Sequence, residues 1–391
     1  MKPTDNVTKY CELSIVMPCL NEEDTIGSCI EKAKKWMVLE GVDGEIVVGD
    51  NGSVDNSKKI AESLGAIVIS VEEKGYGSAL YAATQAATGK YIIFGDADDS
   101  YDFSTLTPFL KRLRDGVDLV MGNRFAGSIE LGAMPWKNRY IGNPFLSWLG
   151  RRLFHTSVKD FHCGLRGLTR KAFEEMDLKT TGMEYASEIV IKASIQGMKI
   201  DQVPINLYKD GRGKPPHLKP WRDGWRHLRF MLLFSPRWLF WYPGCVFFVA
   251  GVVITLWLIG GSKQLFGVTF DIHTLLYALV FSVLGFQAMG FGLLSRKISR
   301  RLGLQLFKGN QYRLDNFFRL ENCLLLGVGL GLLGVVGLFY SIISWAIYGF
   351  NDLIPAVVMR TAIPSATMLI LGVQSILLGF LNSFIDIDVR R

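Results

Sequence analysis

Residues 91–98 read YIIFGDAD, a short β-rich run that ends in two aspartates separated by one alanine. Residues i and i+2 of an extended segment project to the same side, so we expect Asp96 and Asp98 to lie together, with Ala97 between them. Two such carboxylates suit Mg²⁺ or Mn²⁺, which take one or two carboxylates together with substrate phosphates. The pattern therefore indicates a metal site, and a solvated turn at the end of a strand is the alternative.

The residues on both sides of this segment alternate between apolar strands and helices. We predict strands at residues 12–18, 45–50, 66–71, 91–95 and 118–122, with a helix between each consecutive pair. This alternation predicts βαβ units and a mainly parallel, Rossmann-like sheet. Ligands of open α/β sheets bind beyond the carboxyl ends of the strands. Polar side chains are concentrated there: Asn21 and Glu22 after the first strand, Asp50 and Asn51 after the second, and Asp96 and Asp98 after the fourth.

Two common nucleotide-binding motifs are absent from the sequence. The first strand is followed by PCLNE at residues 18–22 instead of G-x-G-x-x-G, and no G-x-x-x-x-G-K-[ST] occurs. Because these motifs bring glycines and a helix N-terminus against phosphates, their absence argues against dinucleotide-dependent hydride transfer and P-loop phosphoryl transfer. The six cysteines and five histidines show no metal-type spacing, so we expect no zinc site.

The C-terminal part of the chain has a different composition. Four stretches without Asp, Glu, Lys or Arg cover about residues 238–262, 272–295, 322–350 and 361–385. Each exceeds the roughly 20 apolar residues that a bilayer-spanning helix needs. The sequence therefore predicts an α/β domain at residues 1–218, an amphipathic interfacial segment at 219–237 and an all-α membrane domain of four helices at 238–391.

Positive charge is concentrated beside these stretches. The chain has 43 Lys and Arg against 36 Asp and Glu, and residues 209–237 carry a net +6 while residues 295–321 carry +5. Short basic loops stay in the cytoplasm, which predicts an integral protein of the cell membrane with the α/β domain and both termini cytoplasmic. Basic residues beside spans predict contact with anionic lipids and not with nucleic acid. The polar start of the chain predicts no signal peptide.

Residues 222–241 (RDGWRHLRFMLLFSPRWLFW) mix arginine and tryptophan with apolar residues. This mixture is typical of an amphipathic helix in the head-group region of a bilayer, with Pro236 separating it from the first span. An ordinary linker helix is the alternative. An interfacial helix would hold an active site at the depth where a lipid phosphate lies.

An ordered set of motifs within residues 12–218 resembles the family 2 glycosyltransferases with the GT-A fold. The set comprises SIVMPCLNE at 14–22, DNGSVD at 50–55, GYGSA at 75–79, YIIFGDAD at 91–98, GNRF at 122–125, DFHCGLR at 160–166, MEYASEIVIK at 183–192 and QVPI at 202–205. It is most similar to the dolichyl-phosphate mannose synthase and polyprenyl-phosphate glucosyltransferase group. The resemblance implies inverting, metal-dependent transfer of one hexose from a nucleotide sugar, UDP-glucose or GDP-mannose, to a polyprenyl or dolichyl phosphate.

The resemblance also implies roles for residues at matching positions, with Asp98, Arg124 and Arg139 as the catalytic group. The donor's base and ribose would be held by Pro18, Glu22, Asp50 and Asn51, its diphosphate and the metal by Asp96, Ala97 and Asp98, and a basic loop near the donor would contain Arg212 and Lys214. Arg124 and Arg139 would bind phosphate groups. The acceptor would be bound by these two arginines together with Arg166 and Glu184. Four features depart from the family pattern. Asn51 replaces an aspartate, and Ser100 replaces a residue that is often glutamine. Residues 163–166 read CGLR instead of the usual S-G-F-R, and two prolines stiffen residues 211–217.

The acceptor determines what chemistry the protein must supply. A phosphate monoester is already ionised near neutral pH, so its attack on the anomeric carbon needs no general base. The protein must instead neutralise the leaving diphosphate, which suits a D-x-D motif and arginines. Glu184 and Glu188, spaced i and i+4, lie on one helical face. They either line the acceptor pocket, where they could include a base for a hydroxyl acceptor, or form an exposed helix face.

Two other functions are compatible with the sequence. A processive polysaccharide synthase also joins this fold to membrane spans, but it typically carries Q-x-x-R-W where residues 234–238 read FSPRW. A non-catalytic membrane scaffold with a degenerate transferase domain is permitted by Ser100 and by the altered loop at 211–217. A homo-oligomer is compatible with all three functions.

Overall fold

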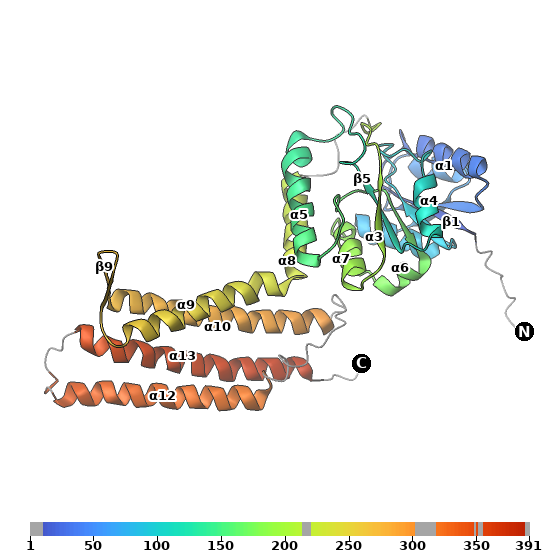
Figure 1. Ribbon diagram of the computed structural model, residues 1–391. Helices are drawn as coiled ribbons and strands as arrows, with labels where there is room; N and C mark the ends of the chain where they lie inside the picture. Colours follow the sequence, from blue (N-terminus) through green and yellow to red (C-terminus); the bar gives the residue numbers. More distant parts are fainter. Residues whose placement is uncertain (1–10, 213–219, 302–317, 348, 351–354, 388–391) are drawn as a thin grey trace, which may run out of the picture. The chain divides into compact units, whose positions relative to one another are not determined.

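The computed structural model describes residues 11–212, 220–301, 318–347, 349–350 and 355–387. The chain forms two compact units, one up to Met231 and the other from Leu232 onward (Figure 1). The division falls inside the segment 219–237 that the sequence marks as interfacial. Lys214 lies outside the described residues.

The first unit is built on a seven-stranded sheet with the order β3-β2-β1-β4-β6-β5-β7. Neighbouring strands are parallel except where β6 lies antiparallel between β4 and β5. The strands are β1 Leu13–Cys19, β2 Gly44–Asp50, β3 Ile67–Ser70, β4 Tyr91–Phe94, β5 Leu119–Asn123, β6 Arg166–Thr169 and β7 Ile200–Pro204. The prediction of a mainly parallel sheet is confirmed, and the five expected strands end within one or two residues of their predicted positions.

Helices connect these strands and lie on both faces of the sheet (Figure 1). They are α1 Ile26–Glu40, α2 Ser57–Ser63, α3 Tyr76–Ala86, α4 Thr107–Arg114, η1 Asn138–Gly142, α5 Asn143–Phe154, α6 Arg170–Met176, α7 Tyr185–Ile195 and α8 Pro220–Leu233. The helix η1 is a short π-helix that leads directly into α5.

The core forms where the apolar faces of the helices cover the sheet. In α1, the buried residues Ile26, Ile30, Ala33 and Met37 recur at helical spacing and pack against the strands. Full burial of an Ile or Leu side chain contributes roughly 1.5–3 kcal/mol, so this face fixes the helix on the sheet. The carboxyl ends of β1, β2, β4 and β5 remain at one edge, where polar loops follow them.

Four described helices of the second unit are long and apolar enough to cross a membrane. They are Arg237–Leu258, comprising η2 Arg237–Trp241 and α9 Tyr242–Leu258; α10 Ile272–Arg301; α12 Leu320–Ile347; and Val357–Asp386 within α13 Pro355–Asp386. Helix α9 packs on α10, α10 also packs on α13, and α12 packs on α13. The four predicted spans are confirmed as helices.

The connections between these helices differ from the expected loops. A short antiparallel hairpin, β8 Lys263–Leu265 and β9 Val268–Phe270, follows α9. Arg360 was expected in a loop but lies inside α13, where it donates to the Leu258 carbonyl at 2.7 Å and pairs with Asp271. The helix extends past this arginine because its charge is compensated at the end of the neighbouring helices.

Candidate active site

Asp96 follows β4 and is held from two sides. The Tyr76 hydroxyl donates to its Oδ1 at 3.0 Å from the start of α3. On the other side Gly164 approaches so closely that a Cβ there would lie 2.4 Å from Oδ2 of Asp96. Burial, together with the nearby charge of Asp98, raises the pKa of Asp96 to about 6. A side chain at the glycine of the DFHCGLR motif would therefore displace the Asp96 carboxylate from its present position.

Asp98 lies two residues further on and binds three groups. Its Oδ1 accepts the Ser100 amide at 3.1 Å and the Ser100 hydroxyl at 2.6 Å, and its Oδ2 accepts from the Arg212 guanidinium. Ser100, a departure from the family pattern, thus orients the carboxylate. Burial alone would lower the pKa of Arg212, but Asp98 and Glu22 raise it above its ordinary value, so the guanidinium stays charged.

Glu22 is the third acidic residue of this cluster and enters from the end of β1. Its Oε2 lies 3.2 Å from Nε of Arg212, and the Ser57 hydroxyl accepts its backbone amide at 2.7 Å. Burial raises the pKa of Glu22 to about 7, although Arg212 opposes that rise. The cluster that the sequence predicts at this edge thus includes Glu22, Asp96 and Asp98, with Arg212 as their shared cation.

Asp50 and Asn51, which follow β2, use their side chains within the protein. Oδ1 of Asp50 accepts the amide of Ser53 at 3.1 Å. The Asn51 amide donates to the carbonyls of Val71 and Glu73 at 3.3 and 2.8 Å and accepts the Gly75 amide at 2.7 Å. An aspartate accepts but does not donate, so asparagine suits this position. Pro18 lies at the end of β1, paired in register with Gly49.

The acidic pair is suited to a divalent cation with ligands from a bound phosphate. The described residues contain no group of three or more His, Cys, Asp or Glu side chains placed to hold a metal. Two carboxylates are nevertheless enough when diphosphate oxygens complete the shell. Arg212 already pairs with Asp98 as a positively charged partner of the acidic cluster.

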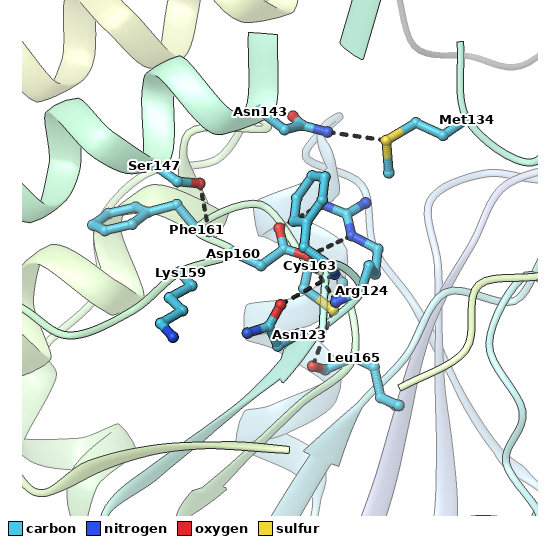
Figure 2. A network of polar contacts seen from close by, with 12 residues as sticks. Asn123, Arg124, Met134, Asn143, Ser147, Lys159, Asp160, Phe161, Cys163 and Leu165 are labelled. Carbon is cyan, nitrogen blue, oxygen red and sulfur yellow. Dashed lines mark hydrogen bonds and ion pairs between the residues drawn. The ribbon is translucent and has the colours of Figure 1, made fainter. Parts of the chain in front are cut away.

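Arg124, directly after β5, is held by a buried carboxylate (Figure 2). Its Nε and Nη2 each lie 2.7 Å from one oxygen of Asp160, and its backbone amide donates to the same carboxylate at 3.1 Å. The attraction of Asp160 raises the pKa of Arg124 well above its ordinary value despite burial, which acts in the opposite direction. This two-bond geometry fixes the guanidinium and occupies one of its edges.

Arg124 and Arg139 line the same cleft. Its volume is about 630 Å³, and Phe125, Ser128, Tyr140 and Pro144 are among the other residues along it. Arg139 belongs to η1, and within the described part of the chain its guanidinium has no ion pair and lies 5.5 Å from the centre of the Tyr140 ring. The fold therefore brings together the two arginines that the sequence assigns to phosphate groups.

The two other residues assigned to the acceptor have partners in the protein. Arg166 is buried and donates to the carbonyls of Cys163 and Phe161 at 2.7 and 3.3 Å and to that of Ala186. Glu184 pairs with Arg226 of α8 at 3.3 Å. Their positions favour roles as braces of the fold, and the acceptor contacts stay predictions.

Glu188 does not form an exposed helix face. It is fully buried, pairs with Lys192 at 2.9 Å and accepts the amides of Lys179 and Thr180 at 3.0 and 2.8 Å. The interpretation as a surface residue was wrong because a period of i and i+4 does not tell which face is covered. Its carboxylate is occupied by Lys192 and by the amides of Lys179 and Thr180, so Glu188 is unsuited to act as a base.

Sequence reasoning missed three parts of this site. Tyr76, inside the G-Y-G stretch, and Asp160, the first residue of DFHCGLR, were not assigned as partners of Asp96 and Arg124. The third part is an apolar surface on η1 and α5, which we call the aromatic face. It consists of Trp136, Tyr140, Ile141, Phe145 and Trp148, between 49% and 64% exposed. Their helical spacing was a usable signal in the sequence.

The comparisons with known proteins match both parts of the chain to one family. Residues 14–177 match Glycosyl transferase family 2, and residues 293–386 match the Glycosyltransferase family 2 C-terminal transmembrane region. A low-salt glycan biosynthesis hexosyltransferase, Agl6 of Haloferax volcanii, is 40% identical over 284 residues, which cover 72% of this chain and 68% of the relative. A dolichyl-phosphate hexose transferase of the same organism is 33% identical over 221 residues, covering 56% of this chain and 92% of the relative.

Among solved structures, glucosyl-3-phosphoglycerate synthase from Mycobacterium tuberculosis in complex with Mn²⁺, UDP and glucosyl-3-phosphoglycerate is similar over 57% of this chain and 79% of that chain. The TM-score is 0.45 and the sequence identity 23%.

A mainly parallel α/β sheet with an acidic pair at its carboxyl edge, followed by four apolar helices, defines the class of a membrane glycosyltransferase. The chain belongs to glycosyltransferase family 2.

Proposed function

We propose that this protein transfers one hexose from a nucleotide sugar to a polyprenyl phosphate, with inversion at the anomeric carbon. The observation that carries the proposal is the cleft lined by Arg124 and Arg139. Strands β4 and β5 both lie antiparallel to β6, so their carboxyl ends share one edge of the sheet. The hydroxyl of Tyr101 accepts the amide of Gly164, the residue packed on Asp96, at 2.9 Å, and Tyr101 also interacts electrostatically with Arg124.

The arrangement suits an acceptor that is already an anion. In the proposed reaction an oxygen of the lipid phosphate forms a bond to the anomeric carbon, and the bond from that carbon to the nucleoside diphosphate breaks. No proton has to be removed from the acceptor, and the described residues at the cleft include no free carboxylate base. Arg139 has no ion pair among the residues that the structure describes, and a guanidinium offers paired donors matched to phosphate oxygens.

The donor would bind at the acidic cluster. Glu22, Asp50 and Asn51 border the space beyond β1 and β2 where the base and ribose are proposed to lie. A Mg²⁺ or Mn²⁺ ion held by Asp96 and Asp98 would neutralise charge on the leaving diphosphate. The residues themselves supply orientation, since Tyr76 and Ser100 each fix one carboxylate.

The aromatic face supports a lipid acceptor. Tryptophan and tyrosine favour the membrane–water interface, because their rings are apolar and carry a polar group. Tyr140 belongs to this face and also lines the cleft, so apolar surface continues from the proposed phosphate site. A bilayer with anionic lipids would cover this face and present the lipid phosphate to Arg139. The dolichyl-phosphate hexose transferase among the relatives is consistent with such an acceptor.

The experiment uses the purified full chain, a polyprenyl phosphate and a panel of labelled UDP- and GDP-hexoses. We expect label in a lipid-extractable product that carries one sugar per prenol and is labile to mild acid. A growing polymer would identify a processive synthase instead. Absence of both transfer and nucleotide-sugar hydrolysis with every donor would favour the non-catalytic scaffold.

We further propose that the α/β domain and both termini are cytoplasmic, because the basic segments flank the first span and join the second to the third. Native Cys19 and Cys163 are buried and poor sites for labelling. An introduced cysteine at Phe266, which is 96% exposed in the β8–β9 hairpin, should react with an impermeant maleimide in intact cells. Lys308→Cys should react only after permeabilisation, and the reverse pattern would contradict the topology.

A further inference from the structure

The Arg212 guanidinium lies on the carboxylates proposed for the donor and the metal. It donates to Oδ2 of Asp98, and its Nε lies 3.2 Å from Oε2 of Glu22. The Arg212 side chain is only 13% exposed. The oxygen of Asp98 that faces Arg212 is also the one that Ser100 leaves unoccupied, because both Ser100 bonds go to Oδ1. Arg212 thus occupies Oδ2, the carboxylate oxygen of Asp98 that would otherwise be open to a metal ion.

The backbone before Arg212 holds it there. The amide of Gly211 donates to the carbonyl of Asp98 at 3.1 Å, and the amide of Tyr208 donates to the carbonyl of Ser100 at 3.0 Å. Residues 207–212, which we call the strap, therefore run along the segment that carries the acidic pair. The position of the guanidinium follows from these main-chain bonds and from its two carboxylate partners.

The charges at this place explain why Arg212 is held there. Asp96, Asp98 and Glu22 act on one another electrostatically at the same edge of the sheet. Three carboxylates in a partly buried space repel one another unless a cation balances them. Arg212 provides that balance within the chain.

We propose that Arg212 is an internal counter-ion that competes with the divalent cation for Asp98 and is released when the donor's diphosphate offers it another anion. This inference rests on the proposed function and extends it. A guanidinium binds phosphate oxygens in the same paired geometry as a carboxylate, so the exchange keeps Arg212 satisfied. Metal and nucleoside diphosphate therefore bind with positive coupling, and the metal alone binds weakly.

The test measures Mn²⁺ binding to the full-length protein in detergent through the EPR signal of free Mn²⁺, without sugar or acceptor. In the absence of nucleotide, Arg212→Ala should bind Mn²⁺ about tenfold more tightly than the wild type or better, because the competing charge is gone. Arg212→Lys keeps a cation and should stay near the wild type. Lys209→Ala removes an exposed charge from the same strap and is the matched control, with little change expected.

A second arm adds UDP or GDP, with the nucleotide–Mn²⁺ complex measured separately without protein. Nucleotide should tighten Mn²⁺ binding to the wild type by about tenfold and should tighten it much less in Arg212→Ala. Equal or weaker binding by Arg212→Ala without nucleotide overturns the inference, and so does a gain of the same size in Lys209→Ala. If the binding results are as expected but no hexose reaches a polyprenyl phosphate, only the proposed function fails.

Discussion

Two charged clusters lie at the carboxyl edge of the sheet, one after β4 and one after β5, and they are balanced in different ways. After β4, Asp98 and Glu22 share the guanidinium of Arg212, which is only 13% exposed and comes from a segment 114 residues further along the chain. After β5, Arg124 forms two bonds of 2.7 Å to Asp160, which is fully buried.

From this difference we infer that the charge of Arg212 is exchangeable and that the charge of Arg124 is fixed. In the proposed exchange, Arg212 leaves Asp98 by a movement of one side chain, and a metal ion or a phosphate takes over the pairing. Removing one partner of the buried pair formed by Arg124 and Asp160 would strand the other charge, which costs roughly 3–5 kcal/mol. Ligand exchange is therefore expected after β4, whereas the ion pair after β5 fixes the Arg124 guanidinium at the cleft.

The largest expected effect comes from Asp98. Asp98→Ala should lower hexose transfer by about 10³-fold or more, since the diphosphate would leave without the cation that the carboxylate holds. Asp98→Asn should be nearly as inactive, because an amide carries no charge. Both variants should remain folded in the membrane, as judged by gel filtration in detergent. EDTA should abolish wild-type transfer and Mg²⁺ or Mn²⁺ should restore it, so full activity in chelator would remove the metal from the mechanism.

The next effect distinguishes the two arginines of the cleft. Arg139→Ala should lower transfer by about 10²–10³-fold with little change in the melting temperature, because Arg139 has no ion pair within the described residues. Arg124→Ala should lower both the rate of transfer and the melting temperature, since it leaves Asp160 buried and unpaired. Arg139→Lys should restore part of the activity, because a point charge replaces a fork. Equal losses of stability in both alanine variants would show that the two arginines are not held differently.

The grouping of the acidic residues after β4 could be predicted from the sequence. Glu22, Asp96 and Asp98 were placed together because the carboxyl ends of parallel strands share an edge, and period-2 spacing put both aspartates on one side. The strand β6 was missed because its sequence, RGLT, is short and partly polar. The partner of Arg124 could not be read from spacing, since Asp160 lies 36 residues away and joins it only through tertiary packing.

A smaller effect concerns pH and the acidic cluster. Burial raises the folded-state pKa of Glu22 from 4.5 to about 7, so the folded protein binds a proton that the unfolded chain releases. This contribution to stability is complete below about pH 4.5 and is lost as the pH rises through about 7. In chelator, the melting temperature should therefore fall between pH 5 and pH 8, by the equivalent of about 2 kcal/mol. Glu22→Gln should flatten this dependence, and an unchanged slope in that variant would assign it to another group.

The smallest effect tests how the cluster after β4 is oriented. Tyr76→Phe removes the hydroxyl that donates to Asp96 at 3.0 Å and leaves the buried ring in place. A hydrogen bond to a charged group contributes roughly 1.5–3 kcal/mol, so transfer should fall about tenfold. The hydroxyl also lowers the pKa of Asp96, which burial raises to about 6. Its loss should therefore move the acid limb of the pH–rate profile to higher pH.

Tyr81→Phe is the matched control for this change, because Tyr81 lies on the same helix and its hydroxyl accepts only from Gln85 in the described contacts. It should keep wild-type activity and the wild-type pH profile. A purely structural role for Tyr76 would lower the melting temperature and leave the profile in place. A shifted profile with an unchanged melting temperature would instead show that the hydrogen bond from the Tyr76 hydroxyl sets the charge of Asp96. This is the cluster that Arg212 is proposed to leave. The ion pair of Arg124 and Asp160 after β5 should contribute no such shift to the pH–rate profile.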